Sequence, residues 1–191
     1  MRSTSNPTHR IVRFDTGRLD FQGWAKCALD VDSLEELHRR SDLQDLPVYE
    51  AMARCVAQLT QAYEACEPLL RNLFSDIVER EVGVRHGVFQ TPPTFRVHLA
   101  GCPTISNFHR DIDYGMGKEC LTVWLPLTRS WDSNSLWIEN SGDCRKMLPL
   151  RLAYGEFAIV DTANNFHGSI MNKTDNTRIS LDSRFIPKTF L

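Results

Sequence analysis

The hydrophobic pattern of this chain changes its period once, at Gly83, and that change constrains the fold more than any other feature. Before Gly83, apolar residues recur every three or four positions, which is the spacing of one face of an α-helix. The first run follows Pro47, with apolar residues at Val48, Met52, Cys55, Val56, Leu59, Ala62, Tyr63 and Cys66. Pro68 is expected to end this helix, because proline lacks a backbone donor. A second helix is expected from Leu69 until Gly83.

After Gly83 the chain consists of short segments that are rich in β-branched and aromatic residues and are separated by Gly, Asn, Asp and Ser. These segments are residues 95–99, 120–127, 135–139, 157–160 and 177–185. Several short strands at such spacing favour an all-β sandwich or barrel. The expected fold is a helical N-terminal half packed on a C-terminal antiparallel β-structure, in a single domain over residues 1–191.

The residues before the first long helix give two further expectations. Residues 10–30 alternate short apolar pieces with Gly17 and Gly23, which predicts two or three strands joined by turns. Ser33 and Glu36 have the spacing of a capping box, so a short helix is expected to begin there.

Composition narrows the classes of partner. The 191 residues carry a net charge of −2, so no basic footprint indicates nucleic-acid binding. No apolar run approaches the ~20 residues of a membrane-spanning helix, and the N-terminus lacks the apolar stretch of a secretory signal. The six cysteines form no C-x-x-C pair, which agrees with reduced thiols. We therefore expect a cytoplasmic protein with a small-molecule substrate and no nucleic-acid or membrane partner, and its oligomeric state stays open.

Three residues in the second half form a candidate metal site. His109 and Asp111 are two positions apart, so on an extended segment both side chains point to the same face. An imidazole beside a carboxylate supplies two ligands of the facial triad that selects Fe(II) when three coordination positions stay open. His167, which follows a predicted strand and a polar turn, is the candidate third ligand. Asp113 is a rival to Asp111 but lacks the His-x-Asp spacing.

A second feature begins eleven residues after His167, where Arg178 and Ser180 share one face of a predicted strand. A guanidinium group binds a carboxylate through two parallel hydrogen bonds. An arginine beside an iron site is what a dicarboxylate co-substrate would require.

With these residues, the second half of the chain resembles the Fe(II)/2-oxoglutarate-dependent dioxygenases. The similarity is to the phytanoyl-CoA hydroxylase branch, and most of all to its small StrG-like members from antibiotic biosynthesis. It is carried by residues 95–99, 109–115, 123–128, 135–139, 154–157 and 167–185, and it spans roughly residues 94–187. The helical part before these segments carries no motif that we can match.

The resemblance implies a mainly β fold with N-terminal helices. Its core would be a double-stranded β-helix (a cupin-like jelly roll) over about 94–187, buttressed by a helical brace over about 32–82. It also implies Fe(II), 2-oxoglutarate as co-substrate, and O₂. The implied reaction decarboxylates 2-oxoglutarate to succinate and oxidises a C–H bond of the substrate, most commonly by hydroxylation.

Family roles transfer position by position. His109, Asp111 and His167 match the metal ligands. The expected 2-oxoglutarate-binding residues are Arg178, Ser180, Trp124 and Ser169. Arg184 lies on the same strand face as Arg178, so it is an alternative carboxylate ligand or a partner of Asp182, and the spacing from His167 favours Arg178.

The substrate-binding candidates lie close in sequence to the ligands or on the same strands. They are Glu139, Tyr114, Asn107, Arg96 and Arg184. The polar character of the motifs indicates a small hydrophilic metabolite, such as an amino acid, a sugar or a guanidino compound. Residues 130–134 and 140–146 are expected to be loops that cover the mouth of the barrel.

Two other hypotheses of function use the same residues. A cupin-like isomerase or hydrolase would bind a different metal at His109, Asp111 and His167 and use no keto acid, but such an enzyme has no need for Arg178 and Ser180. An inactive barrel that serves only for binding would have no need for an intact ligand triad.

Overall fold

The computed structural model describes residues 8–140 and 143–187. Helices occupy the part of the chain before Gly83. They are α1 (Phe21–Leu29), a 3₁₀ turn (Leu37–Arg39), α2 (Ser41–Gln44), α3 (Val48–Gln61), α4 (Tyr63–Leu73), a π-helical turn (Phe74–Val78) and α5 (Glu79–Val82). Two more 3₁₀ turns, Asp111–Tyr114 and Asp132–Asn134, lie between strands.

The strands form two antiparallel sheets. They are β1 (His9–Arg13), β2 (Val88–Phe89), β3 (Thr94–His98), β4 (Leu121–Pro126), β5 (Trp137–Asn140), β6 (Asp143–Pro149), β7 (Glu156–Val160), β8 (His167–Gly168) and β9 (Arg178–Ile186). The larger sheet has the order β1-β7-β4-β9-β2, with β3 also paired to β9, and the smaller sheet has the order β6-β5-β8. This architecture confirms the mainly β fold with N-terminal helices.

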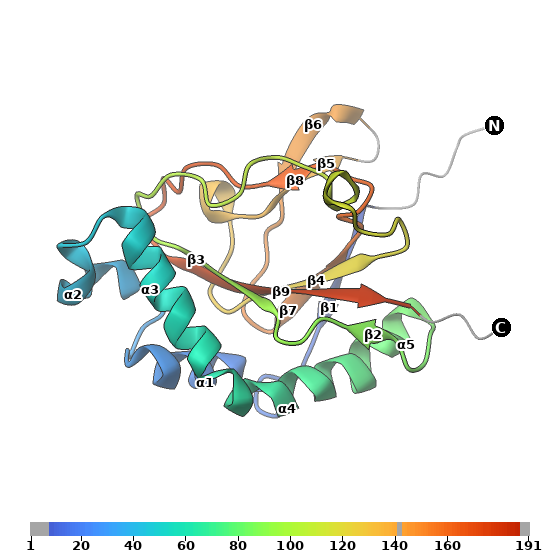
Figure 1. Cartoon of the computed structure of the whole chain (residues 1–191), viewed down its shortest axis with the longest axis horizontal. Helices are drawn as coiled ribbons and strands as arrows, with labels where there is room; N and C mark the ends of the chain where they lie inside the picture. The colour runs from blue at the N-terminus through green and yellow to red at the C-terminus, as the bar shows by residue number, and fades with distance from the viewer. Residues whose placement is uncertain (1–7, 141–142, 188–191) are drawn as a thin grey trace.

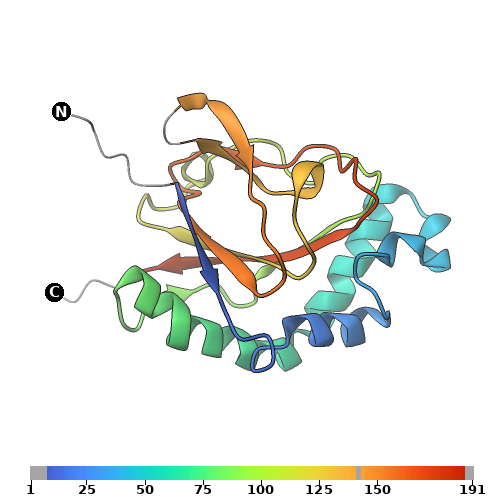
Figure 2. The ribbon, with the colours of Figure 1, turned by 180° about the vertical axis from the view of Figure 1, so that it is seen from behind.

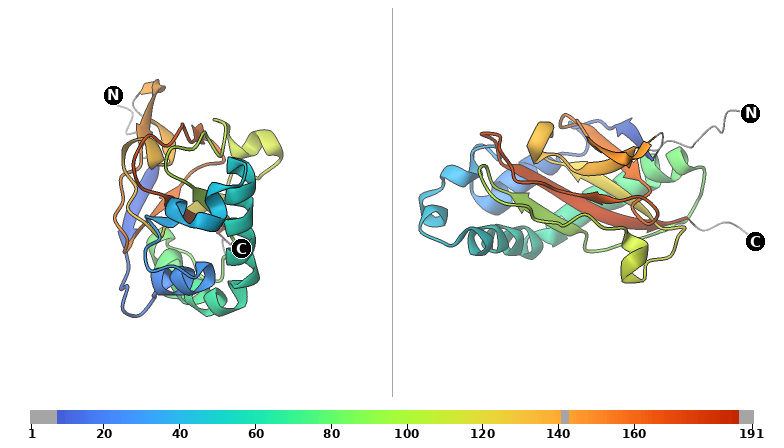
Figure 3. Two further views of the ribbon diagram at one scale, coloured as in Figure 1. Left: turned by 90° about the vertical axis from the view of Figure 1, so that its left-hand side faces the viewer. Right: turned by 90° about the horizontal axis from the view of Figure 1, so that it is seen from above.

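The elements are arranged in three layers. Figure 1 shows the helices along one face of the larger sheet and the smaller sheet on the other side, and the views in Figure 3 show the same order from the side and from above. β1 runs along the edge of the larger sheet beside β7 (Figure 2). β1 and β2 thus belong to the sheet although they lie outside residues 94–187.

The alternation of side chains along β9 explains how one strand serves two layers. Ile179, Leu181 and Phe185 are fully buried in the core shared with the helices. Because successive strand residues point to opposite faces, Arg178 and Asp182 point the other way, toward the smaller sheet. The larger sheet therefore has one apolar face against the helices and one face that carries polar groups into the interior.

The prediction of strands throughout residues 10–30 is wrong after residue 20. β1 forms as expected, but Phe21–Leu29 is helix α1, and Asp20 caps it by accepting a hydrogen bond from the backbone N–H of Gly23 at 2.8 Å. Phe21, Ala25 and Leu29 recur at helical spacing and are fully buried. Gly23, interpreted as a turn, lies inside the helix, where its lack of a Cβ leaves room for the Asp20 carboxylate.

Three smaller expectations also need correction. The break between the long helices falls at Ala62, and Pro68 lies inside α4, where Leu70 and Leu73 bury the apolar face that keeps the helix continuous. The helix expected at Ser33 is a single 3₁₀ turn that begins at Leu37. The expected loop 140–146 contains the start of β6, and residues 141–142 lie outside the described residues.

None of the helices in the described part of the chain is both long and apolar enough to cross a membrane. Five cysteines are free thiols: Cys27, Cys55, Cys66, Cys102 and Cys120.

Candidate metal centre

A partly open cavity of about 40 Å³, lined mostly by polar and charged residues, lies between the two sheets. The strands supply its wall because β3, β4 and β9 direct alternate side chains into it. These include Arg96 from β3, Thr122 and Trp124 from β4, and Arg178, Asp182 and Arg184 from β9. His109, Asp111 and His167 complete the wall on the side of the smaller sheet.

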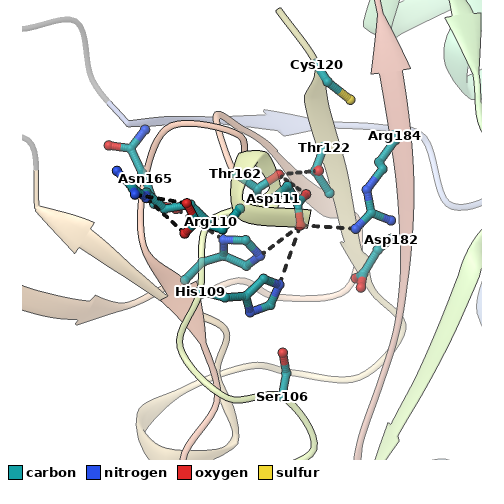
Figure 4. A network of polar contacts seen from close by, with 12 residues as sticks. Ser106, His109, Arg110, Asp111, Cys120, Thr122, Thr162, Asn165, Asp182 and Arg184 are labelled. Atoms are coloured by element: carbon teal, nitrogen blue, oxygen red, sulfur yellow. Dashed lines mark hydrogen bonds and ion pairs between the residues drawn. The ribbon is translucent and has the colours of Figure 1, made fainter. Parts of the chain in front are cut away.

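His109, Asp111 and His167 come together at this cavity, and Figure 4 shows the side chains of the first two directed at each other. One possible ligand atom from each lies within 4.8 Å of the other two. The Oδ1 atom of Asp111 is 3.5 Å from Nε2 of His109 and 3.8 Å from Nε2 of His167. The fold brings the two histidines together through an antiparallel bridge, in which each backbone N–H donates to the other residue's carbonyl oxygen.

Backbone carbonyls orient both imidazoles. Nδ1 of His109 is 2.7 Å from the carbonyl oxygen of Asn107, and Nδ1 of His167 is 3.2 Å from that of Asn165. A proton on each Nδ1 leaves Nε2 as a lone-pair donor directed at Asp111, which is the usual arrangement of metal-ligating histidines. Burial lowers the pKa of His167, so its neutral, ligand-competent form extends to lower pH than in a free imidazole.

The local structure that brings Asp111 to the site differs from the predicted one. It is not on an extended segment with His109 but begins the 3₁₀ turn Asp111–Tyr114, and it is only 3% exposed. Its Oδ2 accepts a hydrogen bond from the Thr162 hydroxyl at 2.8 Å, and its Oδ1 accepts one from Arg184 at 3.2 Å. Burial alone would raise the pKa of Asp111, but Thr162 and Arg184 outweigh it and hold this pKa below its ordinary value.

Asp113, the rival of Asp111, lies outside the cluster. Its side chain is exposed and forms an ion pair with Arg110 at 3.0 Å. The turn that carries Asp111 inward therefore carries Asp113 outward, to the surface.

Arg178 is the most unusual charged group in the cavity. It is 2% exposed, and its Nε and Nη1 atoms find no hydrogen-bond partner among the residues the structure describes. Its guanidinium carbon lies 5.8 Å from the centre of the Trp124 ring, a cation–π contact. Burial lowers the pKa of Arg178 to about 10. The Oγ of Ser180, on the same face of β9, is also buried and without a partner in this part of the chain.

Ser169 and Arg96, in contrast, have partners within the protein. The Ser169 hydroxyl accepts hydrogen bonds from the backbone N–H groups of Ile105 and Ser106 and lies 2.9 Å from the Thr104 hydroxyl. It therefore holds the neighbouring loop in place. Arg96 donates from Nε to Oδ2 of Asp182 at 3.0 Å, so Asp182 pairs with Arg96 and not with Arg184, which was one of the two roles left open for Arg184.

The remaining substrate candidates are not among the residues that line the cavity. The Glu139 carboxylate accepts a hydrogen bond from the backbone N–H of Phe166 at 3.2 Å and does not line the cavity. Tyr114 is 77% exposed, with its ring edge-on to His109 at 5.2 Å. Asn107 is exposed and contributes its backbone carbonyl to His109. Whether these residues bind substrate stays a prediction.

Two site residues were missed by sequence reasoning. The hydroxyls of Thr122 and Thr162 are 2.6 Å apart, and Thr162 in turn donates to Asp111 (Figure 4). Thr122 lies on β4 and Thr162 is the second residue after β7, and these two strands pair in the larger sheet. Threonine is common in strands, so neither position carries a signal that could have identified it in advance.

A comparison with known proteins adds a clear relationship. The chain is 30% identical over 166 residues to the streptomycin biosynthesis protein StrG of Streptomyces griseus, covering 83% of this chain and 79% of that protein. The chain belongs to the StrG family. No protein-family model matches it. The resemblance to StrG-like proteins that the motifs predicted is thus confirmed for most of the chain.

Solved structures confirm the jelly-roll fold of this StrG relative. The carbocyclase SnoK from nogalamycin biosynthesis has a TM-score of 0.55 and 11% identity, over 95% of this chain and 80% of that one. The epimerase SnoN from the same biosynthesis has a TM-score of 0.55 and 15% identity, over 95% of this chain and 78% of that one. EvdO2 from Micromonospora carbonacea var. aurantiaca, in complex with 2-oxoglutarate, has a TM-score of 0.53 and 14% identity, over 95% of this chain and 87% of that one. SnoK and SnoN are described as non-heme α-ketoglutarate-dependent enzymes.

Proposed function

We propose that this protein is a non-haem Fe(II)/2-oxoglutarate-dependent oxygenase of small-molecule biosynthesis. It decarboxylates 2-oxoglutarate to succinate and CO₂ and oxidises a C–H bond of a small polar metabolite, with hydroxylation as the outcome. The relatives support this assignment: StrG is named for streptomycin biosynthesis, and neighbours of the same fold are named as α-ketoglutarate-dependent enzymes.

The donor set in the cavity fits iron. Two neutral imidazoles and one carboxylate are the 2-His-1-carboxylate set of non-haem Fe(II) oxygenases. His109, Asp111 and His167 would hold the ion, with Nε2 of each histidine already directed inward. The same set would also suit other divalent metals, so it does not by itself distinguish an oxygenase from a cupin-like isomerase or hydrolase.

The observation that carries the proposal is the buried guanidinium of Arg178, whose Nε and Nη1 find no hydrogen-bond acceptor among the described residues. Buried N–H groups without an acceptor are strongly unfavourable, so they mark a site for an anion that the protein itself does not supply. A planar guanidinium beside a buried hydroxyl suits a carboxylate, because both can donate to its oxygens. A dicarboxylate keto acid places one carboxylate here and leaves the other end free to reach the metal.

The residues of the chain then divide the work. Arg178 and Ser180 bind the remote carboxylate, and Trp124 shields the guanidinium from solvent. Thr162 and Arg184 hold the Asp111 carboxylate in one orientation. Fe(II), 2-oxoglutarate and O₂, when bound, supply the oxidising power that no side chain provides.

Anaerobic titration tests the proposal. Wild-type protein loaded with Fe(II) is expected to develop a weak visible charge-transfer band when 2-oxoglutarate is added, because the keto acid chelates the metal. Asp111→Ala should abolish the band, whereas the exposed Asp113→Ala should retain it. Arg178→Gln should weaken 2-oxoglutarate binding by about tenfold or more, since a charge-assisted contact is lost. A metal-loaded wild type without the band would overturn the assignment and favour the isomerase or hydrolase reading.

A further inference from the structure

One carboxylate oxygen in the cavity has no hydrogen-bond partner in the part of the chain that the structure describes. Asp182 lies on the cavity face of β9, and its side chain is 17% exposed. Its Oδ2 accepts the hydrogen bond from Arg96, but Oδ1 is buried and finds no donor within residues 8–140 and 143–187. Figure 4 shows this carboxylate directed into the cavity below Arg184. A buried acceptor of this kind requires a donor from outside the protein.

Neither metal nor keto acid supplies that donor. The metal-ligand cluster consists of His109, Asp111 and His167, and Asp182 is not part of it. Bound 2-oxoglutarate offers only acceptor oxygens, which would repel a second carboxylate rather than bond to it. The remaining donors for Oδ1 of Asp182 are water and the substrate, and a substrate group that enters this cavity can take the place of a water.

The charge of the cavity decides which kind of donor fits. Three guanidinium groups, of Arg96, Arg178 and Arg184, line it together with two carboxylates, of Asp111 and Asp182. A ferrous ion and a 2-oxoglutarate dianion cancel each other, so the loaded cavity keeps one excess positive charge. An ammonium or guanidinium group would be repelled in this partly desolvated space. A hydroxyl group donates a hydrogen bond without adding charge.

We propose that Oδ1 of Asp182 binds a hydroxyl group of a neutral, polyhydroxylated substrate, such as a sugar, while Arg96 occupies the other oxygen of the same carboxylate. The assignment rests on the proposed function, because the charge balance includes iron and 2-oxoglutarate. It narrows the substrate class from any small polar metabolite to one that presents a neutral hydroxyl rather than an amine.

Asp182→Asn is the variant that tests the contact between Oδ1 and the substrate hydroxyl. Arg96 needs an acceptor, so it would take the one remaining oxygen of the amide and leave the NH₂ group at the position of Oδ1. An acceptor would thus be replaced by a donor with little change in shape. Arg96→Gln is the matched control, because it removes the same ion pair and leaves Oδ1 as an acceptor.

The experiment uses protein loaded with Mn(II) and 2-oxoglutarate, and D-glucose and D-glucosamine as neutral and cationic probes. The paramagnetic enhancement of probe proton relaxation reports binding close to the metal. We expect enhancement of glucose protons in the wild type and a weaker effect on glucosamine. Asp182→Asn should reduce the glucose effect by about tenfold, and Arg96→Gln should keep it within about twofold of the wild type, because Oδ1 of Asp182 remains an acceptor.

Three outcomes would overturn the inference. They are glucosamine binding more strongly than glucose, equal losses in both variants, and no enhancement for either probe in the wild type. The last outcome would mean that solvent alone satisfies Oδ1. The charge-transfer band of the Fe(II) and 2-oxoglutarate complex is measured on the same proteins. If that band forms normally, the proposed function stands and only the assignment of Asp182 fails.

Discussion

Asp111 shows how single hydrogen bonds shape the candidate metal centre. Its two carboxylate oxygens have different partners: Thr162 donates to Oδ2, and Oδ1 faces Arg184 and both histidines. A carboxylate held in this way presents one defined oxygen to a metal. Thr162 is itself oriented by Thr122, so the position of the ligand depends on two hydroxyl groups that carry no chemistry of their own.

At this scale we predict that Thr162→Val lowers metal affinity, whereas Thr162→Ser retains it. Valine has the shape of threonine but cannot donate to Asp111, so the carboxylate loses both its orientation and part of what keeps its pKa low. Loss of such an outer hydrogen bond typically weakens metal binding by about 10–100-fold. Calorimetric titration with Co(II) measures the affinity directly. Equal affinities for the valine variant and the wild type would show that Arg184 alone orients Asp111.

At the scale of elements, β9 has two faces with different functions. Leu181 and Phe185 bury their side chains against the helices, and the Phe185 ring lies close to that of Phe74, with ring centres 5.6 Å apart. The opposite face carries the polar groups of the cavity. A shift of one residue in strand register would exchange the two faces, so the buried core determines where Arg178 points.

We therefore predict opposite effects from two neighbouring substitutions in β9. Leu181→Ala should lower the free energy of unfolding by about 2–5 kcal/mol, because it leaves a cavity in the core. Ser180→Ala should leave this free energy nearly unchanged, since its buried hydroxyl has no partner in the described part of the chain, but should weaken 2-oxoglutarate binding. Urea denaturation of both variants and titration of the keto acid measure the two effects. A large loss of stability in Ser180→Ala would contradict the division between faces.

At the scale of the whole molecule, the fold stores charged and titratable groups in its interior, and this makes its stability depend on pH. His98 on β3 is fully buried beside Arg178, which lies opposite it on β9. Its Nε2 lies 3.0 Å from the carbonyl oxygen of Pro103. Burial, assisted by the charge of Arg178, lowers the pKa of His98 to about 4.

The expected consequence is a loss of stability in mild acid. Between pH 6.5 and 4 the unfolded chain binds a proton at His98 and the folded chain does not, so stability falls as the pH falls. The full effect corresponds to about 3 kcal/mol. In His98→Asn this part of the pH dependence should disappear. The substitution can also lower the free energy of unfolding by an amount that is the same at every pH, and this does not affect the comparison. Urea denaturation of both proteins at several pH values provides the test, and parallel curves for the two proteins would refute it.

Local pattern determined a large part of this protein. Periodicity placed the two long helices and the strands β3, β4, β5, β7 and β9, because burial of one face imposes a regular spacing on apolar residues. It missed β6, whose first half was expected to be a loop. It failed at Phe21–Leu29, where a glycine inside a helix resembles a turn, and at Pro68, where burial of the helix face overrides the proline. The motif spacing also identified His109, Asp111, His167 and Arg178, which the structure brings to one cavity.

Tertiary structure alone decided the partners of these residues. Residues far apart in the chain meet across strands, so no spacing reveals that Arg184 binds Asp111, that Arg96 binds Asp182, or that Thr162 supports the metal ligand. The same holds for the atoms that find no partner among the described residues, because the isolation of Nε and Nη1 of Arg178 and of Oδ1 of Asp182 depends on everything that surrounds them. The sequence determined which groups could perform the chemistry, and the packing of two sheets decided which of them remain free to bind a ligand, because only the assembled cavity removes water and sets the hydrogen-bond partners.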